Sequence, residues 1–204
     1  MNKKNTPYIS RDRNIKTGPI PVINLPAIET CRKDAPCFKE CYAAKQYRYR
    51  TNNLEAHRRN LRAYQENPRA FFDFIAGNTA LDRFCRWFGS GDIVDADFLA
   101  GMVRVARRNK ETKYLAFTKK YDIVNAYLDS GKKFPKNLTI ILSGWGASFP
   151  AINPHNLPVA YVRFGDEKED IGIPVDAFPC AGNCANCIAC WRMKAGEAVC
   201  FKKH

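Results

Sequence analysis

Cysteines are the residues of this chain whose number and spacing point most directly to chemistry. Nine of them occur in 204 residues. Seven fall into two tight groups near opposite ends of the chain: Cys31, Cys37 and Cys41, and then Cys180, Cys184, Cys187 and Cys190. An odd total excludes complete pairing in internal disulfides, and cysteine clusters in a reducing compartment usually bind metal. We therefore expect one or more metal centres.

The C-terminal group has the more specific pattern, C-x3-C-x2-C-x2-C followed by Trp191. Zinc ribbons and fingers usually use two separated cysteine pairs, whereas a compact run with short gaps is typical of ferredoxin-type cluster ligation. Soft thiolate ligands suit either metal. The run therefore favours a 4Fe-4S cluster, with zinc as the alternative, and one of its cysteines could serve a second cluster.

The N-terminal triplet has a different use, because three thiolates can hold a four-iron cluster and leave one iron open to a substrate or cofactor. Two alternatives stay open: a zinc site completed by His57 or His155, or one cluster shared with the C-terminal group. We expect His57, in the basic stretch EAHRRN, at the surface and His155 in a turn. Cys85 and Cys200 lie in apolar segments and are expected in the core, with ligation by Cys200 left open.

Two glycine-rich segments carry further candidates. Gly89, Ser90, Gly91 and Asp92 follow an apolar run, and Asp92 is either a helix N-cap or a carboxylate that binds a cationic group, with the glycines permitting close approach. Trp145, between two glycines, would stack on a ligand or cover the mouth of the site. Lys119 and Lys120 would hold an anion or remain solvated.

The elements that must position these residues alternate along the chain. Strands are predicted over 20–24, 83–89, 113–118, 137–144, 158–165 and 198–203. Helices are predicted over 38–66 with a break near Thr51, from Pro68, after an N-cap at Asp92 or Asp95, and over 121–131. This alternation predicts one α/β domain over 1–204, built as a partial or irregular β/α barrel of about six strands, with 1–18 as a basic lead-in arm.

Five candidate loops each follow a predicted strand. In β/α barrels the active site forms on the loops at the carboxyl ends of the strands. The first cysteine group, the segment 89–92, the lysines at 119–120, the segment 143–146 and the acidic segment 165–170 should therefore share one mouth.

Composition narrows the function further. Mean hydropathy is −0.41 and charged residues make up 26% of the chain, which argues against membrane, disordered and coiled-coil proteins. The first residues contain no apolar stretch of a secretory signal, so we expect a cytoplasmic protein. The formal net charge is +13, and residues 1–66 hold 14 Lys/Arg against 6 Asp/Glu. Such a basic excess permits nucleic-acid binding, or is a solvated surface.

The ordered motifs CYAAK (41–45), FGSGD (88–92), FTKK (117–120), LSGWG (142–146) and the terminal cysteine run resemble those of the phage-encoded gene product 88 family. The resemblance covers about residue 18 to the end and implies a cysteine-bound iron–sulfur protein in the host cytoplasm. A more distant similarity is to radical S-adenosylmethionine enzymes, which hold a cluster on a three-cysteine loop after strand one. It implies S-adenosylmethionine binding at Gly89–Asp92, although the spacing here, C-x5-C-x3-C, departs from the usual C-x3-C-x2-C.

These observations lead to one principal expectation and two alternatives. The first is a cytosolic iron–sulfur protein, a redox or radical-type enzyme that needs an electron donor. The second is a zinc-stabilised basic protein that binds nucleic acid. The third is a purely structural metal that ties the two ends of the chain together.

Overall fold

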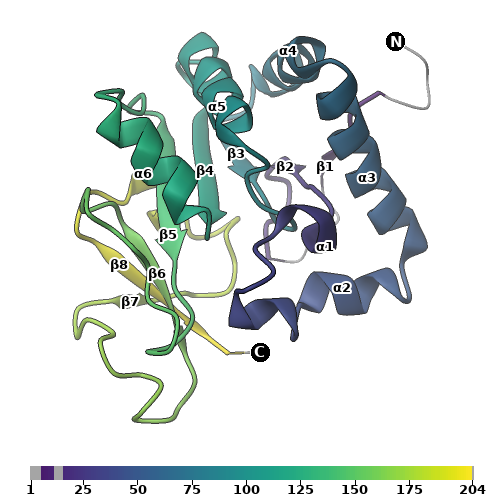
Figure 1. Ribbon diagram of the computed structural model, residues 1–204. Coiled ribbons are helices and arrows are strands. Elements are labelled where there is room, and N and C mark those ends of the chain that lie inside the picture. Colours follow the sequence, from purple (N-terminus) through teal and green to yellow (C-terminus); the bar gives the residue numbers. More distant parts are fainter. Residues whose placement is uncertain (1–5, 12–15, 204) are drawn as a thin grey trace.

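The computed structural model describes residues 6–11 and 16–203 as a mixed α/β structure (Figure 1). Its sheet has eight strands in the order β1-β2-β3-β4-β5-β6-β8-β7. The strands are β1 (Ile9–Ser10), β2 (Val22–Ile23), β3 (Phe84–Trp87), β4 (Lys113–Thr118), β5 (Leu138–Ser143), β6 (Val159–Arg163), β7 (Phe178–Pro179) and β8 (Ala198–Lys202). All neighbouring pairs are parallel except β1 with β2, and β1 and β7 are the edges of an open sheet.

The six predicted strands are confirmed as β2 to β6 and β8. The sequential order from β2 to β5 follows from the helical crossovers, because parallel neighbours need a long connection, and β6 follows β5 through an irregular loop over 144–158. The two edge strands were not predicted, since two residues carry no periodic signal. The sheet does not close on itself, so the observed fold is an open, mostly parallel α/β sheet.

The helices are α1 (Ala27–Thr30), α2 (Tyr42–Tyr47), α3 (Thr51–Glu66), α4 (Pro68–Thr79), α5 (Ala96–Arg108) and α6 (Tyr121–Asp129), with 3-10 turns η2 (Pro36–Phe38) and η3 (Ala189–Arg192). The predicted break near Thr51 separates α2 from α3. Of the two predicted caps for α5, Asp95 is the one used, because its side chain accepts a hydrogen bond from the Phe98 backbone N–H at 2.8 Å. No helix in the described ranges is long and apolar enough to cross a bilayer.

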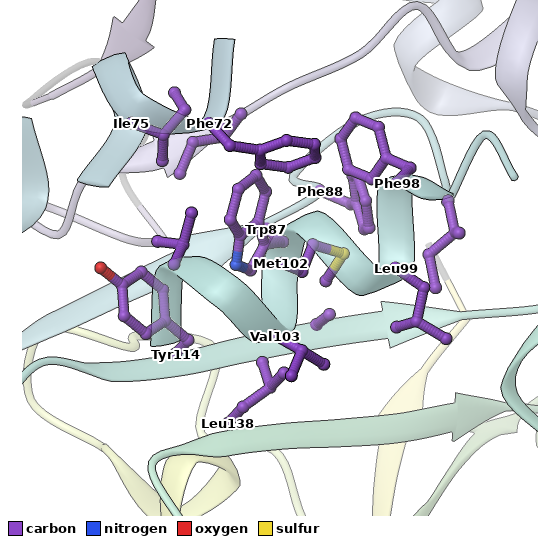
Figure 2. Close-up of a cluster of buried hydrophobic side chains, with 14 of the residues drawn as sticks. Phe72, Ile75, Trp87, Phe88, Phe98, Leu99, Met102, Val103, Tyr114 and Leu138 are labelled. Atoms are coloured by element: carbon purple, nitrogen blue, oxygen red, sulfur yellow. The ribbon is translucent and has the colours of Figure 1, made fainter. Parts of the chain in front are cut away.

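Each face of the sheet has its own apolar core. On one face, Trp87 and Tyr114 pack against residues of α4 and α5 such as Phe72, Phe98 and Met102, as Figure 2 shows. On the other face, Leu115, Ile141 and Val199 pack against Trp191 and Met193 of the C-terminal segment. Alternate residues of β4 therefore contribute to opposite cores, and the cysteine run covers the face without the long helices.

The lead-in also packs on the domain where the structure describes it. β1 pairs with β2, and the backbone N–H of Tyr8 donates to Asn60 Oδ1 of α3 at 2.6 Å. The carbonyl of Lys16 accepts a hydrogen bond from the backbone N–H of Cys184 at 2.6 Å. Residues 1–5 and 12–15 of the predicted arm lie outside the described residues.

Candidate functional site

A cavity of about 250 Å³ lies at the carboxyl ends of β2 to β5. Its lining contains all five predicted cofactor-binding residues and three of the seven predicted metal ligands: Cys31, Cys37, Cys41, Gly89, Ser90, Gly91, Asp92 and Trp145. We call it the thiol cavity. The structure thus brings together residues that are more than a hundred positions apart in the sequence.

The three thiols reach the cavity from one irregular segment. Cys31 ends α1, Cys37 lies in η2, and Cys41 precedes α2. Burial, with smaller contributions from Asp92 and the two other cysteines, raises the pKa of Cys31 to about 12. Burial also raises the pKa of Cys37, against the opposing charge of Lys119. Without a metal these two thiols are protonated at neutral pH.

Asp92 organises the part of the cavity wall next to Cys31, and its backbone N–H donates to Thr30 Oγ1 at 3.1 Å. Its carboxylate accepts hydrogen bonds from Thr118 Oγ1 at 2.5 Å and from the backbone N–H groups of Lys119 and Ile93 at 2.9 and 2.7 Å. Burial raises its pKa, and these hydrogen bonds oppose the rise. Asp92 therefore joins the loop after β3 to the end of β4, and its observed partners are protein groups.

Two glycines beside Asp92 allow the loop after β3 to pack closely against the residues that follow β2. A Cβ on Gly91 would lie 2.6 Å from the backbone oxygen of Leu25, and its φ is +83°. A Cβ on Gly89 would lie 2.8 Å from Asn24 Oδ1. Both glycines therefore allow the loop to approach the end of β2, where Ser90 also donates to the Leu25 carbonyl at 3.1 Å.

The Lys119 side chain lies in the part of the cavity wall formed by the ends of β4 and β5. Lys119 Nζ donates to Ser143 Oγ at 2.8 Å and lies 5.9 Å from the ring centre of Trp145. Trp145 packs its edge on Phe164, with ring centres 5.6 Å apart. Lys119 is half-buried in the cavity wall, and Lys120 does not line the cavity.

Four of the five loops predicted to share the mouth contribute to the cavity. The fifth, over 165–170, does not line it. The Asp170 carboxylate accepts hydrogen bonds from the backbone N–H groups of Phe164 and Gly165, so this loop folds back on itself. Its Glu169 carbonyl accepts a hydrogen bond from the Ala147 N–H, which places it behind the loop of Trp145.

The histidines do not complete a zinc site with the triplet. His57 is buried rather than exposed as predicted, and its Nδ1 is 2.8 Å from the Tyr47 hydroxyl. His155 Nε2 is 2.8 Å from Asp129 Oδ1 on α6. Among the described residues, no three His, Cys, Asp or Glu side chains are placed to hold a single metal ion.

The C-terminal cysteines form a second group apart from the triplet. Cys180, Cys184 and Cys190 pack against the apolar core beside Trp191, and the described lining of the thiol cavity contains none of the four. Burial raises the pKa of Cys190 to about 12. All nine cysteines are free, and Cys85 and Cys200 are buried as predicted.

Arg86 is a residue that the sequence analysis missed. It lines the thiol cavity, and its guanidinium carbon lies 5.1 Å from the ring centre of Phe117. Its charge lowers the pKa of Cys184 and Cys190, against the larger effect of burial. Its buried Nε has no hydrogen-bond partner within the described part of the chain. Arg86 thus lines the thiol cavity while its charge acts on the C-terminal cysteines.

Comparison with known proteins agrees with the motifs that converge here. The sequence model of the family described as gene product 88 matches residues 1–198. The chain belongs to the gene product 88 family. Searches of curated proteins and of solved structures give no match.

Proposed function

We propose that this member of the gene product 88 family is an iron–sulfur protein whose first cluster is held by Cys31, Cys37 and Cys41. The observation that carries the proposal is that all three thiols line one cavity at the carboxyl ends of parallel strands. A four-iron cluster binds each thiolate at a different iron, so its ligands stay farther apart than those of one ion. Three thiolates around one cavity are therefore a donor set that suits a four-iron cluster with one open iron.

A four-iron cluster supplies one-electron transfer, and three thiolate ligands leave one of its irons open to a further ligand. The chain's own residues on the facing wall suit a ligand with a carboxylate and a ring. The Lys119 ammonium attracts the carboxylate, Ser143 holds that ammonium in place, and the exposed part of Trp145 packs on the ring. S-adenosylmethionine has both groups, and we propose it as the second ligand of this cavity.

We propose that the C-terminal cysteines hold a second cluster. Three of them lie against the apolar core, where a metal centre is shielded from water, and Arg86 supplies a compensating positive charge. The sheet would then be an incomplete β/α barrel filled by this segment. An ion pair of 3.3 Å between Lys203, just after β8, and Glu40, in the first cysteine loop, supports that reading. A small reducing protein of the cytoplasm would be the electron donor.

Anaerobic purification followed by iron, sulfide and zinc analysis tests the proposal. Wild-type protein should absorb near about 400 nm and contain about eight irons per chain if both four-iron clusters are present. Replacing Cys31, Cys37 and Cys41 together by serine should remove about half of the iron. Cys85→Ala, at a buried cysteine of β3 outside both groups, is the matched control and should keep all of it.

The outcomes separate the alternatives. Colourless protein that contains zinc would replace this proposal by the zinc-stabilised one. Unchanged iron in the triple variant would show that the N-terminal cysteines are not ligands. The same comparison with serine at the four C-terminal cysteines tests the second cluster independently.

A further inference from the structure

A second cavity, of about 570 Å³, lies on the other side of the loop that follows β3. Tyr42, Ala43, Gly89 and Ser90 line both cavities, and the Tyr42 hydroxyl donates to the Gly89 carbonyl in the partition between them. The second cavity is larger than the thiol cavity, and its volume lies within the range of small-molecule sites, roughly 300–1,000 Å³. Nothing in the proposed iron–sulfur chemistry uses it.

The lining of this cavity selects against cations. Among its described lining residues there is no carboxylate, and Arg50 is the one charged side chain. The side-chain amides of Gln46 and Asn53 also face it, and neither makes a hydrogen bond with another described residue. Tyr8 and Tyr47 add aromatic rings. The lining therefore suits a ligand that combines an anionic group, a flat ring and several polar atoms.

A chain of hydrogen bonds fixes one wall of the cavity. The Tyr47 hydroxyl lies 2.8 Å from both His57 Nδ1 and Ser90 Oγ. Because Ser90 donates to the Leu25 carbonyl, its oxygen accepts from Tyr47, and His57 Nδ1–H then donates to Tyr47. Burial lowers the pKa of His57 to about 4, so its ring is neutral at neutral pH. The wall offers polar atoms and no fixed charge.

The corner between α2 and α3, residues 48–50, adds an aromatic ring and positive charge outside the cavity. Tyr49 is 88% exposed and stands between the exposed side chains of Arg48 and Arg50. No ion pair joins either arginine to a described acidic residue. An exposed ring flanked by two unpaired guanidinium groups combines a stacking platform with phosphate-binding charge. The first 66 residues carry most of the basic excess of the chain.

We propose that the Arg48–Arg50 corner and the second cavity bind a single-stranded nucleic acid. Arg48 and Arg50 contact its phosphates, a base stacks on Tyr49, and one nucleotide enters the cavity, where the amide and hydroxyl groups meet its polar atoms. A duplex keeps its bases stacked on one another, so it cannot use the ring of Tyr49 in this way. A nucleotide in the second cavity would lie beside the thiol cavity, because the two share a wall.

Fluorescence anisotropy with labelled 12-nucleotide DNA and RNA single strands tests the proposal on full-length protein between 50 and 200 mM salt. Tyr49→Ala should weaken binding at least about fivefold, since one base stack contributes roughly 1–3 kcal/mol. Arg48→Gln with Arg50→Gln should lower the slope of log affinity against log salt by about 1.4, at about 0.7 for each phosphate contact on a single strand. Arg107→Gln, an exposed arginine on α5, is the matched control and should change neither value.

The role of the second cavity in strand binding is tested by a variant that changes no charged residue. Ala56 lines it from α3, and Ala56→Leu narrows it with a residue that helices accommodate well. This variant should also weaken strand binding, while thermal melting confirms that all variants are folded. Affinity unchanged in Ala56→Leu, or unchanged in the Tyr49 and arginine variants, would overturn the proposal.

Two further comparisons distinguish a single strand from a free nucleotide and from a duplex as the ligand. Binding of nucleoside monophosphates without binding of strands, or a preference for duplex over single strand, would overturn the assignment of a single strand. The assay needs no iron, so it is repeated on chelated protein. Strand binding that survives chelation supports this inference even if the iron–sulfur proposal fails.

Discussion

The indole Nε1 of Trp191 donates a hydrogen bond to the backbone carbonyl of Cys85, 106 residues earlier in the chain, over 2.9 Å. Its ring also packs edge-on against Phe84, with ring centres 5.7 Å apart. Trp191 directly follows the last cysteine of the C-terminal run, while Cys85 lies in β3. One side chain therefore anchors the cysteine run across the face of the sheet.

Removing that hydrogen bond should loosen the cysteine run. Trp191→Phe keeps an aromatic ring but leaves the Cys85 carbonyl without this donor, so the free energy of unfolding should fall by about 1–2 kcal/mol. Urea unfolding measures the loss, and hydrogen exchange should show faster exchange over 180–190. Trp145→Phe is the control, because the Trp145 indole N–H has no described partner. Equal stability of Trp191→Phe and wild type would show that the anchor contributes nothing.

The loops of the candidate site were predictable because the strands were. β4 and β5 are apolar runs bounded by glycine, proline and polar residues, so their carboxyl ends, and hence Lys119 and Trp145, could be placed from the sequence. Sheet topology then determines that loops after parallel neighbours lie side by side. This reasoning correctly brought Cys31, Asp92 and Trp145 to one cavity.

The sequence was less informative about features that tertiary contacts determine, such as the burial of a side chain or the shape of a cavity. His57 is buried because its ring packs on Tyr47, ten residues earlier, and the basic neighbours in its own helix give no sign of that contact. Arg86 had a readable signal: it alternates in β3 with the buried residues Cys85 and Trp87, which places it on the opposite face. The second cavity depends on the angle between α2 and α3, which no local pattern encodes.

Gly101 should be the least replaceable glycine of the helical layer. It lies in α5 against α4, and a Cβ there would lie 2.0 Å from Phe72 Cε2. Phe72 is itself buried, so the ring has little room to move, and Gly101→Ala should lower stability by about 1–3 kcal/mol. The matched control is Gly77→Ala in α4, where a Cβ meets nothing within 4 Å. That variant should gain up to about 1 kcal/mol from helix propensity.

Thermal melting of the two glycine variants gives the comparison directly. Opposite shifts of melting temperature are expected. A gain in both variants would mean that α4 and α5 can separate without cost, and that the contact between Gly101 and Phe72 is not tight.

The neutral His57 should make stability depend on pH. Its pKa is about 4 in the folded protein and near 6.5 when unfolded, so between these values the unfolded chain binds more protons. The free energy of unfolding is therefore unaffected by His57 above pH 6.5. As the pH falls from 6.5 toward 4, protonation of His57 in the unfolded chain lowers it by about 3 kcal/mol in total. His57→Gln removes the titrating group and should flatten this part of the stability curve. Urea midpoints measured at intervals from pH 4 to 7 provide the test.

The control for this experiment is His155→Gln. His155 Nε2 lies 2.8 Å from Asp129 Oδ1 on α6, away from His57, so this variant shows what loss of a partly exposed histidine does to the same curve. Identical curves for wild type and His57→Gln would show that the buried imidazole is not the source.

The last prediction concerns removal of metal, and it rests on the proposed second cluster. The segment 180–193 contains one short 3-10 turn and holds its place through side-chain packing, the Trp191 hydrogen bond and the Cys184–Lys16 backbone contact. The helices α3 to α5 pack on the opposite face of the sheet and need nothing from this segment. Anaerobic chelation should therefore lower the melting temperature and expose 180–190 to protease, while α3 to α5 stay protected. Metal binding and local folding are coupled in this way when ligands come from an irregular segment.

If chelation instead unfolds the helical layer at the same time, the two faces form one cooperative unit that the metal holds together. If it changes neither melting nor cleavage, the C-terminal cysteines do not bind a metal that supports the fold.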